Sequence, residues 1–300
     1  MPTLVMEARE TVKSEDPEIV IPAFMKLLDR KIHETKDMLI ERYNYMCAQN
    51  PASAKFMYEN KSMSGYVPEE GIKSALRHGT LVIGQLGMAE TLQLLIGKDQ
   101  TTSEGLELAK KIEALFLKRT TEFKKQYHLN FGVYYTPAEN LCHTAMDKFK
   151  NKYGIIEKVS DRDYFTNSIH VPVWEEIDAF EKIDIESQLT GYSNAGCITY
   201  VELDGAVEGN LGALEKIVNH AMEKDIPYFA INIPLDTCLV CGYTDELDNT
   251  CPECGSELIQ RLRRVTGYLT GNYTTAFNKG KQQEVEMRYK HSNKLDFTEQ

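Results

Sequence analysis

A chain of 300 residues can form one large domain or two ordinary ones, each with an ample core. Its 42% hydrophobic and 26% charged residues are typical of a soluble globular protein. The net charge of −11 and the lack of a Lys/Arg-rich run argue against nucleic-acid binding. No secretory leader and no run of about 18 apolar residues occur, so we expect a cytoplasmic protein outside the membrane.

The spacing of apolar residues predicts alternating helices and strands in chain order. A helix is expected over residues 17–48, a strand at Thr80–Gly84, helices at Met88–Ile96 and Ser103–Gln126, a β-rich run at Asn130–Tyr135, and a helix at Leu141–Tyr153. Farther on, strands at Cys197–Leu203 and Tyr228–Ile233 flank a helix at Leu211–Lys224. This alternation predicts an α/β fold with a parallel sheet.

Four cysteines form two C-x2-C pairs, Cys238/Cys241 and Cys251/Cys254, and a glycine follows each pair. Glycine permits the tight turn that brings both sulfurs of a pair to one ion. Four thiolates make a closed tetrahedral shell, so we expect a structural Zn²⁺ in a short ribbon. The alternatives are two disulfides, four unliganded thiols, or an iron–sulfur or rubredoxin-like iron site.

Ten residues after the last of these cysteines begins the run Arg264–Leu269, RVTGYL. A glycine in such a run, here Gly267, is usually part of a turn. A Cα radical is nevertheless favoured at glycine, because no Cβ obstructs planarity and the flanking amide and carbonyl share the unpaired electron. The motif alone leaves both interpretations open.

Several separate segments resemble anaerobic (class III) ribonucleoside-triphosphate reductases, which are oxygen-sensitive glycyl-radical enzymes. They are TPAEN at Thr136–Asn140, GIIEKVSDRDYFTNSIHVPVWEEIDAFEK at Gly154–Lys182, SNAGCITYVE at Ser193–Glu202, both CxxCG knuckles, and RVTGY followed by NKGKQQEV. GQLGMAETLQLL at Gly84–Leu95 is similar to the family's preceding barrel segment, so the likeness covers nearly the whole chain.

This resemblance implies the C-terminal half of a ten-stranded α/β barrel with a small four-cysteine zinc ribbon. It implies that a separate radical-SAM activating enzyme removes a hydrogen atom from Gly267. The radical then passes to a finger-loop cysteine, whose thiyl form abstracts the ribose 3′ hydrogen and starts reduction of a ribonucleoside triphosphate to its deoxy form.

By the same likeness, Thr136, Pro137, Ala138, Glu139 and Asn140 lie near the substrate phosphates. Backbone N–H groups at the start of the following helix suit anionic oxygens. The alternative for this segment is a plain helix cap, with Pro at N1 and Glu at N3. Both interpretations can hold together.

The family's N-terminal regulatory domain, first barrel half and thiyl cysteine have no counterpart in this sequence. Cys47 and Cys142 are expected to be buried apolar side chains, and Cys197 to pack in the core rather than to do redox work. We therefore expect the chain to be inactive alone and to require an N-terminal half, the activating enzyme and a second copy in a homodimer. The alternatives are a non-catalytic zinc-ribbon remnant or interaction module, and a glycyl-radical spare part.

The expected division of the chain has three segments. Residues 1–235 form the C-terminal half of the barrel, 236–258 the four-cysteine ribbon, and 259–300 the glycyl-radical loop and tail.

Overall fold

The computed structural model describes residues 1–60, 62–135, 138, 140–204, 209–265 and 268–291. Within these ranges the helices are α1 (Pro2–Val12), α2 (Pro17–Cys47), α3 (Lys55–Glu59), α4 (Ile72–Leu76), α5 (Met88–Ile96), α6 (Ser103–Tyr127), α7 (Asn140–Tyr153), α8 (Ala179–Thr190), α9 (Leu211–Glu223), α10 (Tyr273–Ala276) and α11 (Lys279–Glu286). The strands are β1 (Thr80–Ile83), β2 (Asn130–Val133), β3 (Thr199–Glu202), β4 (Phe229–Asn232), β5 (Leu235–Cys238), β6 (Thr244–Asp245), β7 (Ile259–Val265) and β8 (Tyr268–Thr270).

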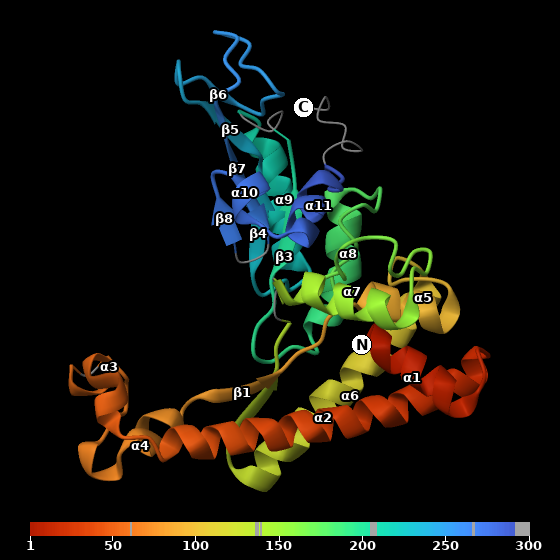
Figure 1. Cartoon of the computed structure of the whole chain (residues 1–300), viewed down its shortest axis with the longest axis vertical. Coiled ribbons are helices and arrows are strands. Elements are labelled where there is room, and N and C mark those ends of the chain that lie inside the picture. Colours follow the sequence, from red (N-terminus) through yellow and green to blue (C-terminus); the bar gives the residue numbers. More distant parts are fainter. Residues whose placement is uncertain (61, 136–137, 139, 205–208, 266–267, 292–300) are drawn as a thin grey trace.

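The long helix α2 forms the base of the molecule (Figure 1). Asp16 caps it by accepting a hydrogen bond from the backbone N–H of Glu18, and Pro17 occupies the first turn, where no N–H is needed. Val20, Phe24, Leu28 and Ile32 recur every four residues and are buried. This stripe packs α2 against α1, α5 and α6 and forms much of the main core.

Two parallel strand pairs confirm the predicted α/β character. Strand β1 pairs with β2 from Thr80↔Asn130 to Ile83↔Val133, and α5 and α6 connect them. Strand β3 pairs with β4 from Thr199↔Phe229 to Glu202↔Asn232 across α9. In the described ranges these pairs remain separate sheets, so a mixed α/β fold is confirmed while the ten-stranded barrel stays a prediction.

A four-stranded antiparallel sheet follows, in the order β6-β5-β7-β8. It lies at the opposite end of the molecule from α2 (Figure 1). Strand β5 runs directly on from β4 and ends at Cys238, and β7 leads from the cysteine region to Val265. The strand that enters the cysteine region and the strand that leaves it thus belong to the same sheet.

Several helices have no counterpart in the sequence prediction, namely α1, α3, α4, α8, α10 and α11. Helix α1 packs against α2 through Val5 and Ala8. Helix α8 begins after Asp178, whose carboxylate accepts a hydrogen bond from the Glu181 N–H. Its apolar periodicity is broken because Lys182 and Glu186 are buried on its inner face, so sequence spacing does not reveal it.

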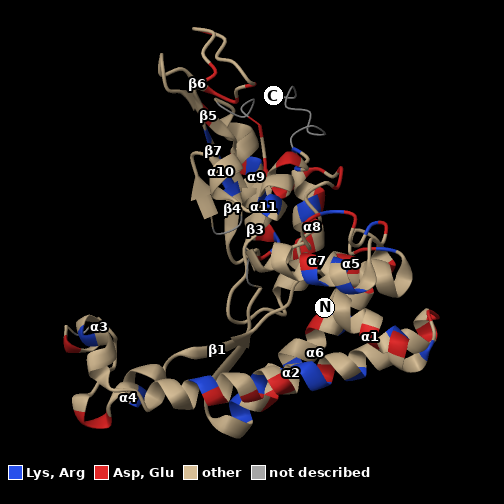
Figure 2. Cartoon of the chain, viewed as in Figure 1, with Lys and Arg blue, Asp and Glu red and all other residues tan. Residues whose placement is uncertain are grey.

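Charged residues of both signs are interspersed along α2 and α6 (Figure 2). Among the described residues, no helix has the length and apolar character that crossing a membrane requires.

A buried carboxyl group lies in the main core. Glu113 of α6 is fully buried, and its Oε1 accepts a hydrogen bond from Gln85 at 2.9 Å. Burial raises the pKa of Glu113 from 4.5 to about 8. The folded chain therefore keeps this proton over a pH range in which the unfolded chain has lost it.

We expect Glu113→Gln to stabilise the fold at pH 8. Between pH 4.5 and 8 the unfolded state binds fewer protons at this site than the folded state, so wild-type stability falls as pH rises. The largest slope is about 1.4 kcal/mol per pH unit. Urea unfolding should show the variant to be more stable at pH 8 and the difference to shrink towards pH 4.5. A difference that grows at low pH would contradict this.

Candidate metal centre and adjoining strands

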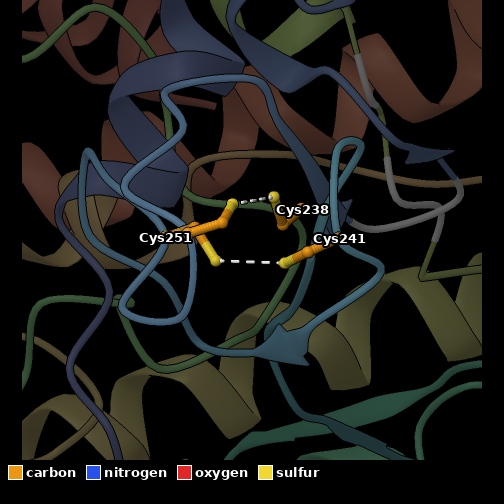
Figure 3. Close-up of side chains that lie close together, drawn as sticks. Cys238, Cys241 and Cys251 are labelled. Carbon is orange, nitrogen blue, oxygen red and sulfur yellow. Dashed lines mark hydrogen bonds between the residues drawn. The ribbon is translucent and has the colours of Figure 1, made fainter.

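The four cysteine sulfurs converge on one point. All four Sγ atoms lie within 4.8 Å of one another. The Sγ atoms of Cys238 and Cys254 are 3.5 Å apart, as are those of Cys241 and Cys251. Figure 3 shows Cys238, Cys241 and Cys251 directing their sulfurs into a shared space. All seven cysteines of the chain are free thiols, so the disulfide alternative is not what the structure forms.

The two knuckles repeat one backbone turn. Gly242 donates its N–H to the Cys238 carbonyl at 2.9 Å, and Gly255 donates to the Cys251 carbonyl at 2.8 Å. Both glycines have positive φ, 78° and 72°, which an L-residue with a side chain adopts only with strain. The glycine after each pair is therefore required by the turn, as the sequence predicts.

These residues fit a tetrahedral metal. With Zn–S bonds of about 2.3 Å, neighbouring sulfurs are roughly 3.8 Å apart, close to the spacing found here. Backbone N–H groups of Cys241 and Val240 face the Cys238 sulfur and lower the pKa of this thiol, whereas the pKa values of Cys241 and Cys254 are raised, so Cys238 is the first of these three to become the thiolate that binds metal. Leu247, Tyr243 and Ile259 pack beside the buried sulfurs. A shell filled by four thiolates leaves no position for a substrate, so the site suits a structural ion.

Strand β7 extends from the cysteine cluster to the neighbourhood of Gly267. It begins at Ile259, beside the cluster, and ends at Val265, which is completely buried. Its six residue steps cover about 20 Å. Val265 pairs directly with Tyr268 of β8. Gly267 itself lies outside the described residues, between these two strands in sequence.

The segment predicted to lie near phosphates is described only at Ala138 and Asn140. Ala138 has a φ of 53° and α7 begins at Asn140, while the helix-cap interpretation depends on Pro137 and Glu139. Thr136, Pro137 and Glu139 lie outside the described residues. Asn278 Nδ2 donates to Asn140 Oδ1 at 2.8 Å, which joins this segment to the start of α11.

The other cysteines have structural environments that differ from one another. Cys142 is buried, donates to Asn167 Oδ1 at 3.1 Å, and has its pKa raised to about 12 by burial. Cys197 is buried within the main core, as predicted. Cys47 is half-buried at the end of α2, so the prediction that it is buried is wrong.

A buried polar group next to β3 is absent from the sequence prediction. Glu186 is fully buried and accepts hydrogen bonds from Lys182, from the Val171 N–H at 3.1 Å, and from His170 Nδ1 at 3.2 Å. Lys182 and His170 hold the pKa of Glu186 well below its usual range despite burial. His170 and Lys182 line a cavity of about 40 Å³ together with Glu202, Glu284 and Arg288. In the sequence, the polar run Thr166-Asn167-Ser168 just before His170 is the signal that could have indicated this buried polar group.

Comparison with known proteins gives the family of the chain. The family model for anaerobic ribonucleoside-triphosphate reductase matches residues 1–291. The enzyme of that name from Enterobacteria phage T4 is 32% identical over 279 residues, and the match covers 89% of this chain and 44% of the relative. The Salmonella typhimurium enzyme is 29% identical over 286 residues, with 90% and 39% covered.

A solved structure of an anaerobic ribonucleotide reductase superposes with a TM-score of 0.72 at 20% identity. The superposition covers 96% of this chain and 43% of that one. This superposition shows that the chain, with its two parallel strand pairs and its four-cysteine ribbon, has the fold of the corresponding part of an anaerobic ribonucleotide reductase. The chain belongs to the anaerobic ribonucleoside-triphosphate reductase family. It spans about two fifths of the length of these relatives.

We expect the purified chain to carry zinc. Native mass spectrometry should find a bound ion, and Cys251→Ser should remove it, because three thiolates leave the shell incomplete. Cys47→Ser, a thiol outside the cluster, is the control and should keep its metal. A chain isolated anaerobically without metal, or with iron instead, would contradict the zinc assignment.

Proposed function

We propose that this chain is the radical-bearing C-terminal segment of an oxygen-sensitive ribonucleoside-triphosphate reductase, and that it stores a radical at Gly267. The observation that carries the proposal is the sheet order β6-β5-β7-β8 in a chain of this family. The strand that leaves the cysteine cluster and the strand after Gly267 are directly paired. A glycine placed between two such strands can be presented to a reaction partner in a fixed position.

In this proposal Cys238, Cys241, Cys251 and Cys254 hold a structural Zn²⁺. The ion closes the ribbon and makes the end of β5 rigid. The cluster is about 20 Å of strand away from Val265, so its contribution is positional. The chemistry at Gly267 is the loss of one hydrogen atom from Cα to an external radical, which a radical-SAM activating enzyme would supply.

Residues 136–140 are proposed to contact the substrate phosphates. Ala138 supports this proposal, because a left-handed backbone at a residue with a side chain is costly and concentrates at functional sites. The N–H groups at the start of α7 suit an anion. The hydrogen bond between Asn140 and Asn278 links this segment to the start of α11.

The proposed partners are a ribonucleoside triphosphate, the activating enzyme, the remainder of the family's fold with its thiyl cysteine, and a second copy in a homodimer. The proposal also retains the division of the chain into a barrel segment (residues 1–235), a ribbon (236–258) and a radical segment with its tail (259–300). The pairing of β5 with β7 joins the ribbon to the radical segment.

Oxygen should cut the activated chain at Gly267. A glycyl radical reacts with oxygen, and the backbone then breaks, releasing a peptide that ends at Gln300. Mass spectrometry after anaerobic activation and air exposure should detect it. Gly267→Ala should stay intact, while Gly212→Ala on α9, where an added Cβ meets nothing closer than 3.9 Å, should be cut normally. An intact wild-type chain after verified activation would refute the radical assignment.

Nucleotide reduction should require the rest of the enzyme. Co-expression with a polypeptide that supplies the remaining family sequence, including the thiyl cysteine, should give deoxyribonucleotide formation under anaerobic conditions. The same mixture with Gly267→Ala should associate equally well but form no product. Failure of the wild-type chains to associate would instead favour a non-catalytic zinc-ribbon remnant or interaction module.

A further inference from the structure

A buried carboxylate lies between the cysteine ribbon and the strand that leads to Gly267. Asp236 is on β5, two residues before Cys238, and its side chain is completely buried. A buried carboxylate is costly unless hydrogen-bond donors and positive charge surround it. Here the donors come from two separate regions of the chain.

The first region is the ribbon. The backbone N–H of Leu247 donates to Asp236 Oδ2 at 3.0 Å. Arg261 extends this connection, because its guanidinium donates to the carbonyls of Leu247 and Asp248, both at 2.7 Å. The loop between the two cysteine pairs is therefore attached to both Asp236 and Arg261.

The second region is β7. Arg263 binds both carboxylate oxygens of Asp236, with Nη2 to Oδ2 at 3.0 Å and Nη1 to Oδ1. Arg261 Nη1 lies 3.4 Å from Oδ2. Arg261 is the direct cross-strand neighbour of Asp236, and Arg263 is its diagonal neighbour on the same face. A two-point contact between Arg and carboxylate fixes orientation as well as distance.

These contacts lead directly to the strands around Gly267. Arg263 pairs with Thr270 of β8, and the Arg261 N–H donates to the Gly271 carbonyl at 2.8 Å. On the other face of β7 the guanidinium of Arg264 lies 5.4 Å from the centre of the Tyr200 ring of β3. Strand β7 thus contacts the ribbon on one face and β3, a member of the β3–β4 strand pair, on the other.

We propose that Asp236 is a positioning residue for Gly267: its carboxylate fixes β7 to the cysteine ribbon and thereby sets the place at which the glycine is presented. This inference rests on the proposed function. Removing this carboxylate distinguishes metal binding from the positioning of Gly267, because the altered chain retains all four metal ligands. Radical formation should then be lost while metal binding is kept.

The test is Asp236→Asn in the full chain, incubated anaerobically with a radical-SAM activating enzyme of this family. The substitution keeps the shape but removes the charge that two arginines share. We expect the glycyl-radical signal in electron paramagnetic resonance to fall about tenfold or more, since a misplaced reacting centre is penalised steeply. Zinc content should equal that of wild type, and hydrogen exchange of peptides covering residues 259–271 should be faster.

Asp245→Asn is the matched control, because Asp245 is exposed on β6 directly opposite Asp236 and should change none of these readouts. Arg263→Lys keeps the charge but loses the two-point contact, so it should give an intermediate radical yield with normal zinc. This milder variant decides the question if Asp236→Asn does not fold.

Wild-type radical yield and exchange in the folded Asp236→Asn chain would overturn the proposal, and so would loss of zinc in parallel with loss of radical. If the wild-type chain forms no radical, the proposed function fails instead. The exchange measurement then decides alone: faster exchange at residues 259–271 with zinc retained supports the positioning role, and unchanged exchange overturns it.

Discussion

The pairing of β5 with β7 is the constraint on which the C-terminal region depends. It sets Leu235 opposite Leu262 and Cys238 opposite Ile259, so the ribbon and the strand towards Gly267 share one hydrogen-bonded ladder. A register shift of one residue would turn Arg261 and Arg263 to the other face and leave Asp236 buried without its charge partners. Hydrogen bonding and burial of charge therefore specify the same register.

Much of this site is predictable because it is encoded locally. The C-x2-C-G pattern specifies a turn whose glycine needs positive φ, and four thiols with this spacing can meet at one point. Helices such as Met88–Ile96 have the bounds that the sequence predicts, because their apolar residues have a clear period. The parallel pairing of β1 with β2 follows from the strand–helix–strand order.

What could not be predicted depends on contacts distant in sequence. Asp236 looks like any polar residue of a short strand, and only its placement beside Arg263 reveals a buried charge cluster. The SNAG segment is recognisable by resemblance alone. In the structure Asn194 Oδ1 accepts the Val133 N–H at 2.8 Å, and a side chain at Gly132 would collide with Ala195. No periodicity encodes such a contact.

The strand pair β1–β2 has a consequence for handling the chain. Residues 193–196 cover the outer side of β2, whereas β1 has no strand beyond it in the described ranges, and Val82 is exposed there. An open strand edge with apolar side chains is a template for unwanted pairing with other chains. The outer edge of β1, at Thr80–Ile83, is therefore a place where this polypeptide can pair with another chain when nothing covers it.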